Sequence, residues 1–384
     1  MNVPKLRFKE FTDEWVTCTI NSVAEVISGG TPDTTNSNYW DGSINWFTPS
    51  EVGKSKYISN SKRKITQLGL QKSSAKLLPV GTILLSSRAT VGESSILSNN
   101  EACTNQGFQS LIPHKNINNE FLYYLIYKYK KSLLKQAFGS TFLEISKNNV
   151  EKIKINIPTA MKEQVKLSTF LSLLDRKIEL QTKKIEVLKL FKSYTKSEIF
   201  KNGNHVCKLG AILNKWNKKN KDGAINYVES ISNKAGFIPQ SEQFEDRNVA
   251  SKNLRNYYVI KKGVFGYNPS RLNVGSLALK ENDFISVVSP LYECFTTTQN
   301  NTYLFEWFNS NNFKKETFSK FEGGVRNTLN FNNLCDIPIN LPDIETQNQY
   351  AKYFNKINFK ISLEEQKLSE LVKLKKGLLQ EMFI

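Results

Sequence analysis

The sequence contains very little of the chemistry that most catalytic or metal centres use. Its only histidines are His114 and His205, so a Ser–His–Asp arrangement or a histidine-based zinc site is not expected. The five cysteines are scattered without any Cys-x-x-Cys spacing, which favours reduced, buried thiols. No run approaches the roughly 18 apolar residues of a membrane span, and the first residues lack a signal-peptide core. We therefore expect a cytoplasmic protein with no metal site and no membrane segment.

Loops that bind cofactors are missing as well. Gly53-Lys54-Ser55 has the ending of a phosphate-binding loop, but Thr48 stands where the first glycine should be. Tyr267-Asn268-Pro269-Ser270 lacks the second proline and the aromatic residue of the Asn-Pro-Pro-Tyr element of amino-methyltransferases. We expect no catalytic residues and no cofactor bound by this chain. These absences disfavour a self-sufficient DNA-modifying enzyme.

Positive charge is the strongest compositional feature. Lys and Arg total 53 against 35 Asp and Glu, which gives a net charge of +18. Residues 161–200 contribute +4 and residues 343–384 contribute +1, so +13 remains on the rest of the chain. A polyanion is the first partner that such a charge suggests. If nucleic acid binds, we expect it to bind outside these two segments.

The sequence repeats itself, and an offset of 183 in residue number carries Gln164 onto Gln347. From Gln164 to Phe200 apolar residues step alternately by four and three, with Gln181 at the one missing place. The same spacing returns after Gln347, with Glu364 as the polar exception. This alternation is typical of helices that pair side by side, and two matching patterns predict that these helices are partners. The seam residues are Leu167, Leu171, Leu174, Ile178, Ile185 and Leu188 in the first helix, and Tyr350, Phe354, Ile357, Ile361, Leu368 and Leu371 in the second.

The repeat extends beyond the two helices. Residues 148–158 and 332–342 share six identities in eleven positions, and residues 87–92 resemble residues 270–275. The chain is therefore interpreted as a tandem duplication of a globular part followed by a long helix. We expect an α+β fold in which two α/β-type domains are separated by two long antiparallel helices forming a coiled-coil spacer. Strands are predicted at 82–86, 257–260 and 285–288, and shorter helices at 121–138 and 304–313.

Two arginines are candidate DNA contacts. The chain has only eight arginines, and the offset of the repeat carries Arg88 of the first copy onto Arg271 of the second. A guanidinium can form two parallel hydrogen bonds with guanine or with a phosphate. A framework arginine that holds a loop is an equally good interpretation, so both remain open.

Other polar and aromatic residues complete the candidate interface. The side-chain amides of the asparagine and glutamine candidates could read adenine, although amides in loops mostly cap turns. The glycine-flanked residues near 140 and 326 suit phosphate binding, and plain loops are an equal alternative. Tyr39, Trp40 and Trp46 could stack on bases, but packing is the favoured interpretation. The candidates besides the two arginines are Asn105, Gln106, Ser140, Thr141, Asn268, Asn273, Arg326 and Asn327.

With these features, the chain resembles the specificity subunits of type I restriction-modification systems. The resemblance covers essentially the whole sequence, and the repeated helix after a proline-ended strand is its most specific part. Ser289-Pro290 in the second copy departs from the Asn-Gln pair of the first. The motifs that carry the resemblance are residues 4–8, 11–15, 29–32, 39–40, 81–92, 105–108 and 158–178, with the echo at 342–361.

The resemblance implies two target recognition domains, at 1–160 and 201–342, with helical spacers at 161–200 and 343–384. Each domain would read one half of a split site in double-stranded DNA. Two modification subunits would bring S-adenosylmethionine, and two restriction subunits would bring ATP and Mg. The alternative is a basic nucleic-acid-binding protein without strong sequence preference. Such a protein is expected to have an arginine-rich tail or a repeated aromatic stacking pair, and neither is present.

Overall fold

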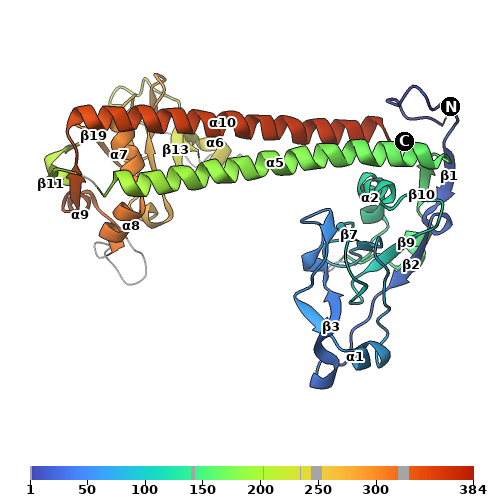
Figure 1. Cartoon of the computed structure of the whole chain (residues 1–384). Helices are drawn as coiled ribbons and strands as arrows, with labels where there is room; N and C mark the ends of the chain where they lie inside the picture. The colour runs from blue at the N-terminus through green and yellow to red at the C-terminus, as the bar shows by residue number, and fades with distance from the viewer. Residues whose placement is uncertain (1, 140–142, 202, 234, 244–252, 319–327) are drawn as a thin grey trace. The chain divides into compact units, whose positions relative to one another are not determined.

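The computed structural model describes residues 2–139, 143–201, 203–233, 235–243, 253–318 and 328–384 (Figure 1). The chain divides into two compact units, and each is described here by itself. The first unit comprises Met1–Leu180 and Lys367–Ile384, and the second comprises Gln181–Gln366. Both units mix helices with strands, which confirms the expected α+β class. The finer boundaries at 160, 200 and 342 remain a prediction.

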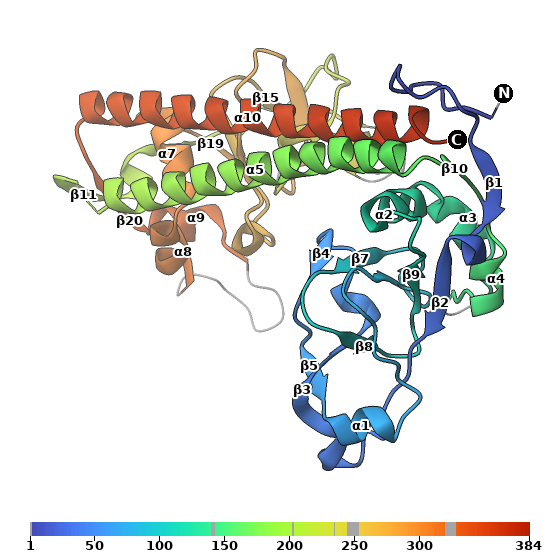
Figure 2. The same cartoon turned by 45° about the vertical axis from the view of Figure 1, so that its right-hand side comes forward.

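The first unit is built on two sheets with helices beside them (Figure 2). The larger sheet has the order β2-β9-β6-β7-β4, and the smaller has the order β5-β3-β8. Strand β1 pairs separately with β10. The strands are β1 Val16–Thr19, β2 Ala24–Ser28, β3 Trp40–Phe47, β4 Tyr57–Ile58, β5 Arg63–Ile65, β6 Ile83–Leu85, β7 Ser94–Leu97, β8 Ala102–Thr104, β9 Gln109–Pro113 and β10 Lys154–Ile157; the helices are α1 Gln67–Gln71, α2 Asn119–Lys128, α3 Lys130–Lys135 and α4 Lys147–Glu151.

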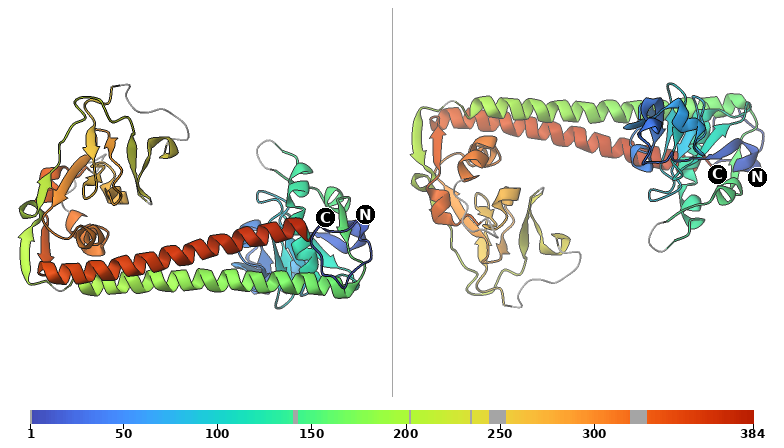
Figure 3. Two further views of the ribbon diagram at one scale, coloured as in Figure 1. Left: turned by 90° about the horizontal axis from the view of Figure 1, so that it is seen from above. Right: turned by 90° about the horizontal axis from the view of Figure 1, so that it is seen from below.

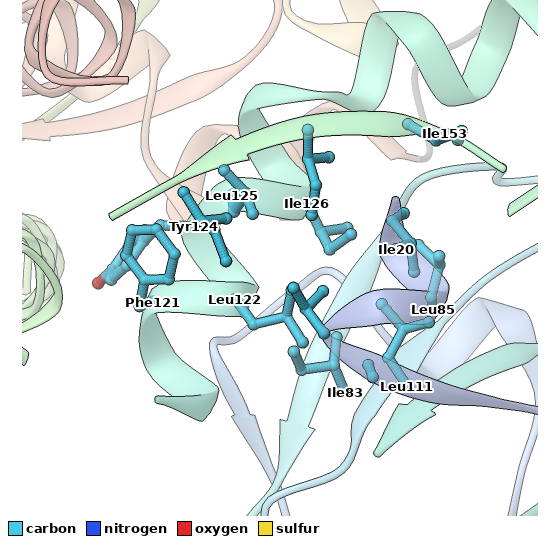
Figure 4. Packing of buried hydrophobic residues seen from close by; sticks show 14 of the residues in the cluster. Ile20, Ile83, Leu85, Leu111, Phe121, Leu122, Tyr124, Leu125, Ile126 and Ile153 are labelled. Atoms are coloured by element: carbon cyan, nitrogen blue, oxygen red, sulfur yellow. The ribbon is translucent and has the colours of Figure 1, made fainter. Parts of the chain in front are cut away.

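The core of the first unit lies between α2 and the larger sheet (Figure 4). Helix α2 begins at a capping residue, Asn118, whose side chain accepts a hydrogen bond from the backbone amide of Phe121. Phe121, Leu122 and Leu125 are completely buried, as is Ile83 on β6. Each buried apolar side chain of this size contributes about 1.5–3 kcal/mol relative to exposure. The core therefore fixes α2 firmly on the sheet.

The second unit repeats this plan with smaller sheets. Its largest sheet has the order β12-β19-β16-β17, and β11 pairs with β20 as β1 pairs with β10. The strands are β11 His205–Lys208, β12 Leu213–Lys215, β13 Glu229–Ser232, β14 Gly236–Pro239, β15 Tyr258–Ile260, β16 Phe265–Tyr267, β17 Leu277–Leu279, β18 Ser286–Val288, β19 Glu293–Thr297 and β20 Pro338–Leu341; the helices are α6 Gln240–Gln243, α7 Asn301–Phe308, α8 Asn311–Phe318 and α9 Phe331–Cys335.

Most of the predicted elements are present, with two differences. The strands expected at 82–86, 257–260 and 285–288 are confirmed as β6, β15 and β18. The helices expected at 121–138 and 304–313 each divide into two, because α2 ends at Lys128 and α7 ends at Phe308. Apolar spacing continues across both breaks, so the periodicity alone did not reveal them.

The duplication is also visible in the hydrogen bonds that connect each globular part to its long helix. Gln164 accepts a bond from the backbone amide of Asn118, the capping residue of α2, and donates one to the carbonyl of the proline after β10. Gln347 makes the same two bonds, with Asn300 before α7 and the proline after β20. Both glutamines are buried. A buried amide that satisfies backbone groups in this way fixes the start of each long helix.

The long helices are α5, Met161–Ile199, and α10, Ile344–Glu381. Within each unit their segments lie side by side (Figure 3). The predicted seam faces inward throughout. Its buried members are Leu167, Leu171, Leu174, Ile185, Phe354, Ile357 and Ile361, and its half-buried members are Ile178, Leu188, Tyr350, Leu368 and Leu371.

The two polar exceptions in the seam meet each other. The side-chain amide of Gln181 donates hydrogen bonds to the backbone carbonyl and the carboxylate of Glu364, at 2.9 and 2.7 Å. Lys184 donates to the other carboxylate oxygen at 2.9 Å. Glu364 is only 4% exposed, so these partners compensate a buried charge. A single polar pair in an apolar seam favours one register over those shifted by a heptad.

Replacement of one member of this pair should destabilise the chain. Glu364→Leu removes the carboxylate to which the half-buried Gln181 amide and Lys184 both donate, and only the backbone carbonyl of residue 364 remains as an acceptor. We therefore expect a loss of about 1–3 kcal/mol in unfolding free energy. The double variant Gln181→Leu/Glu364→Leu removes both polar groups and should recover that loss. Denaturant unfolding of the full chain measures both, with the exposed neighbour Glu365→Leu as control. A double variant no more stable than Glu364→Leu would contradict this account of the seam.

Candidate nucleic-acid interface

Six of the ten predicted DNA-contacting residues lie in the described part of the chain. They are Arg88, Asn105 and Gln106 in the first unit, and Asn268, Arg271 and Asn273 in the second. Ser140, Thr141, Arg326 and Asn327 lie outside the described residues. Among the described residues no three His, Cys, Asp or Glu side chains gather as metal ligands, and no helix there is long and apolar enough to cross a bilayer.

The guanidinium of Arg88 is engaged within its own unit. It donates three hydrogen bonds to the carboxylate of Glu144, at 2.7, 2.8 and 3.0 Å. The backbones of Arg88 and Glu144 also form an isolated β-bridge. Both side chains remain more than two-fifths exposed, so the pair is accessible at the surface. This geometry is that of a framework arginine joining two loops.

The loops that carry Arg88 and Arg271 differ in length. The carbonyl of Ser87 accepts a hydrogen bond from the amide of Ile145. In the second unit the corresponding bond, from Leu329, ends on the carbonyl of Pro269. The offset of the repeat would instead match Ser87 with position 270. The glycines that end the two loops, Gly92 and Gly275, do obey the repeat and have φ near 86° and 89°. The second loop therefore contains one extra residue. Equal spacing in the sequence concealed this insertion, and the correspondence between the two arginines remains a prediction.

Asn105 and Gln106 belong to a pair of closely packed loops. The Asn105 side chain accepts a bond from the amide of Gly107, and Gln106 accepts one from the hydroxyl of Thr31. A Cβ on Gly29 would overlap the carbonyl oxygen of Asn105, so only glycine permits this approach. Gln106 is exposed, whereas Asn105 is half-buried. The loop pair presents the Gln106 side chain at the surface in a fixed position.

The candidates of the second unit lie on one exposed loop. The Asn268 side chain accepts a bond from the amide of Ser270 and thereby caps the turn. Arg271 and Asn273 follow it and are both exposed. Gly275 ends the short helix Leu272–Val274 in the left-handed region. The loop therefore offers a guanidinium and an amide to solvent close to each other in the chain.

A stacked arginine on β5 adds a candidate that the sequence did not reveal. The guanidinium carbon of Arg63 lies 3.6 Å from the ring centre of Trp40 and 5.5 Å from that of Trp46. The two indoles are buried and pack edge to face, which confirms that they are packing residues. Arg63 is exposed, and no carboxylate among the described residues forms an ion pair with it. A guanidinium held flat on an indole keeps its hydrogen-bond donors free at the edge.

The stacked arginine and the paired loops share a support. Trp46 donates its indole hydrogen bond to the carbonyl of Gly30, whose amide donates to the carbonyl of Thr104. Trp46 and Arg63 are direct cross-strand neighbours on β3 and β5, so their side chains lie on one face of the small sheet. Three segments of the first unit are thus joined around Trp46. They present Arg63 and Gln106 on a rigid frame.

Comparison with known proteins assigns part of the chain to a family. Residues 12–190 match the family described as the type I restriction modification DNA specificity domain. The chain is 35% identical over 281 residues to the type I restriction enzyme MjaIX specificity subunit of Methanocaldococcus jannaschii, which covers 70% of this chain and 62% of that protein. Residues 12–190 are a type I restriction modification DNA specificity domain. It is also 29% identical over 215 residues to the EcoR124I/EcoR124II specificity subunit of Escherichia coli, covering 51% and 52%. Each match spans between half and two-thirds of the relative.

Two solved structures resemble the fold described above over nearly its full length. The type I restriction-modification S subunit from M. genitalium aligns with a TM-score of 0.62 at 16% identity, covering 100% of this chain and 99% of that one. A chain from a structure concerned with complex assembly and conformational transition of the type I R-M system gives 0.62 at 14% identity, covering 98% and 99%. At these identities the likeness concerns the fold alone.

In this specificity domain, Arg63 has no direct signal in the sequence for a physical reason. Its partner Trp40 belongs to a different strand, and only the antiparallel pairing of β5 with β3 brings the two together. The scarcity of arginine was a usable signal, because it left few candidates to weigh. The shared offset of Arg88 and Arg271 instead favoured Arg88, whose guanidinium is already engaged by Glu144.

Substitutions in the Arg88–Glu144 pair can distinguish a framework role of Arg88 from a contact with DNA. If Arg88 acts only by holding Glu144, Arg88→Ala and Glu144→Ala should change DNA affinity equally, within about 0.5 kcal/mol. We expect this equality, measured by fluorescence anisotropy with the assembled complex and a duplex carrying its target. If Arg88 contacted DNA, Arg88→Ala would weaken binding while Glu144→Ala would release the guanidinium and strengthen it. That opposite pair of effects would contradict the framework role.

Proposed function

We propose that the chain is the sequence-specific DNA-recognition subunit of a type I restriction-modification complex, and that each globular part reads one half of a bipartite target. The observation that carries the proposal is that the two globular parts share one framework but expose different side chains. Gln164 and Gln347 hold equivalent frames. The exposed surfaces differ, since the first unit presents Gln106 and the stacked Arg63 and the second presents Arg271 and Asn273 on a longer turn. A duplicated reader of this kind suits two unlike half-sites.

Charge supports the same proposal. The long helices account for little of the net +18, so the globular parts carry the positive charge that attracts DNA phosphates. We propose that the chain carries no catalytic centre. Two modification subunits would bring S-adenosylmethionine to methylate adenines, and two restriction subunits would bring ATP and Mg for translocation and cleavage. The chain would act in the cytoplasm.

A substitution of the stacked arginine tests the half-site proposal. Arg63→Lys retains the positive charge but loses the planar pair of donors, so we expect specific binding to weaken by about 1–3 kcal/mol. Recognition should relax in one half of the methylated motif and remain intact in the other. Methylated adenines can be mapped genome-wide in cells carrying the variant and its partner subunits.

The neighbouring Lys62→Ala provides a matched control for Arg63→Lys. Lys62 is exposed on the same segment and should affect all DNA sequences alike, which is typical of phosphate contacts. Omission of the modification subunit in vitro should abolish methyl transfer, because the chain alone should not methylate DNA. Relaxation of both half-sites together by Arg63→Lys would contradict the proposal of one reader per half.

We also propose that α5 and α10 set the spacing between the half-sites. One heptad with the same seam spacing, inserted between Leu180 and Gln181 and another between Glu364 and Glu365, keeps Gln181 opposite Glu364. Seven residues add about 10 Å at 1.5 Å per residue. This length equals about three base pairs at 3.4 Å each. The mapped motif should keep both half-sites while its unread gap widens by about three base pairs.

An insertion in only one helix is the control for this experiment. It shifts one seam against the other and should abolish methylation rather than change the gap, because paired helices need a common register. Full activity with an unchanged gap after the double insertion would show that the helices do not determine the spacing.

A further inference from the structure

Each globular part meets the long helices through a cluster of polar side chains. In the first unit Tyr124 of α2 donates a hydrogen bond to the carboxylate of Asp175 on α5, at 2.6 Å. Lys375 of α10 lies 2.5 Å from the other oxygen of that carboxylate. Tyr124 is completely buried, and the side chains of Asp175 and Lys375 are less than a quarter exposed. We call these three residues the first joint.

The second unit has a corresponding cluster built from different residues. Asn358 of α10 donates a hydrogen bond to Glu306 of α7 at 3.0 Å, and Lys192 of α5 donates to the same oxygen at 2.7 Å. Glu306 is 2% exposed. Burial acts to raise the pKa of Glu306, but Lys196 and Lys192 outweigh it and the pKa is lowered, so the carboxylate is ionised. Glu306, Asn358 and Lys192 form the second joint.

The two joints are equivalent position by position. Tyr124 is the sixth residue after Asn118, which caps α2, and Glu306 is the sixth after Asn300, which caps α7. Along the long helices the offset that carries Gln181 onto Glu364 also matches Asp175 with Asn358 and Lys192 with Lys375. The lysine is the same in both joints. The carboxylate is on the long helix in the first joint and on α7 in the second.

The charges around each joint are compensated when the joint contains one carboxylate. In the first unit Lys56 donates to Glu120 at 2.8 Å, and Glu120 also accepts a bond from Ser172, so these neighbours balance each other. In the second unit Lys196 lies 2.7 Å from the other oxygen of Glu306 and adds a second cation to the same carboxylate. Removal of the Glu306 carboxylate would therefore take the acidic partner away from two half-buried lysines, Lys192 and Lys196.

We infer that the two joints are matched sets that assign each globular part to its own end of the helical pair. Helix α7 at the first joint would place Glu306 against Asp175, so two carboxylates would share Lys375. Helix α2 at the second joint would place Tyr124 against Asn358 and leave Lys192 and Lys196 without a carboxylate. Either arrangement buries charge without compensation, which is strongly destabilising. The inference concerns assembly of the chain and does not depend on the proposed DNA recognition.

Three full-chain variants with identical amino-acid composition test this inference. The first exchanges the globular sides of the joints, Tyr124→Glu with Glu306→Tyr. The second exchanges the long-helix sides, Asp175→Asn with Asn358→Asp. The third combines all four substitutions and so exchanges the complete joints. Each is compared with the unmodified chain by far-UV circular dichroism during heating.

Both double variants should unfold about 5–10 °C below the unmodified chain in their lowest transition. The fourfold variant should return to within about 3 °C of it, because each joint again has one carboxylate for its shared lysine. A control exchanges the exposed ion pair of the same helices, Lys189→Glu with Glu365→Lys, whose side chains are 56% and 48% exposed. The control should change the midpoint by less than about 2 °C.

The outcomes decide the inference in each case. Recovery by the fourfold variant supports it, and so does a soluble, folded fourfold variant when the double variants fail to fold. A fourfold variant no more stable than the double variants overturns it. Double variants as stable as the unmodified chain also overturn it, as does an equal loss in the exposed control pair. Loss of DNA recognition in any variant leaves this conclusion unchanged, since unfolding is measured without DNA.

Discussion

The structure depends on the packing of the ends of the long helices into the globular cores. Phe383, which follows α10, stacks on Phe121 in the first unit with ring centres 5.6 Å apart. Phe200, which follows α5, packs on the equivalent Tyr303 in the second unit at 5.3 Å. Each core is thus completed by an aromatic residue at the end of the other copy's helix. Since these rings are buried, neither globular core is complete without that helix.

Polar residues within this apolar scaffold act as markers of position. The contact of Gln181 with Glu364 specifies the register of the helical pair, and the two joints specify which globular part meets which end. Buried polar groups contribute little net stability, because desolvation offsets their attraction. Their value here is that every alternative arrangement leaves some of them unpaired. Duplication alone would have produced two interchangeable halves, and the changed residues at 124, 175, 306 and 358 remove that ambiguity.

The candidate interface was predicted less well than the fold. Asn105 and Gln106 were identified from residue type, and the structure places them in a loop held by Gly29 and Thr31. The equivalence of Arg88 and Arg271 remains a prediction, because the second loop contains one extra residue between Pro269 and Gly275. Arg63 was missed because its indole support is assembled by strand pairing. Surface loops carry no periodic pattern, so residue type is the only signal that they offer.

The sequence by itself determined the duplication, the paired helices and their inward seam. Such features are periodic, and apolar spacing translates directly into a buried face of a helix. It also indicated the family, through motifs spread over the whole chain. Only the tertiary structure decided that Gln181 bonds to Glu364, that Arg63 stacks on Trp40, and that Tyr124 corresponds to Glu306. These contacts join residues that are distant in the sequence, and their geometry depends on packing and strand register, which leave no periodic trace in the sequence.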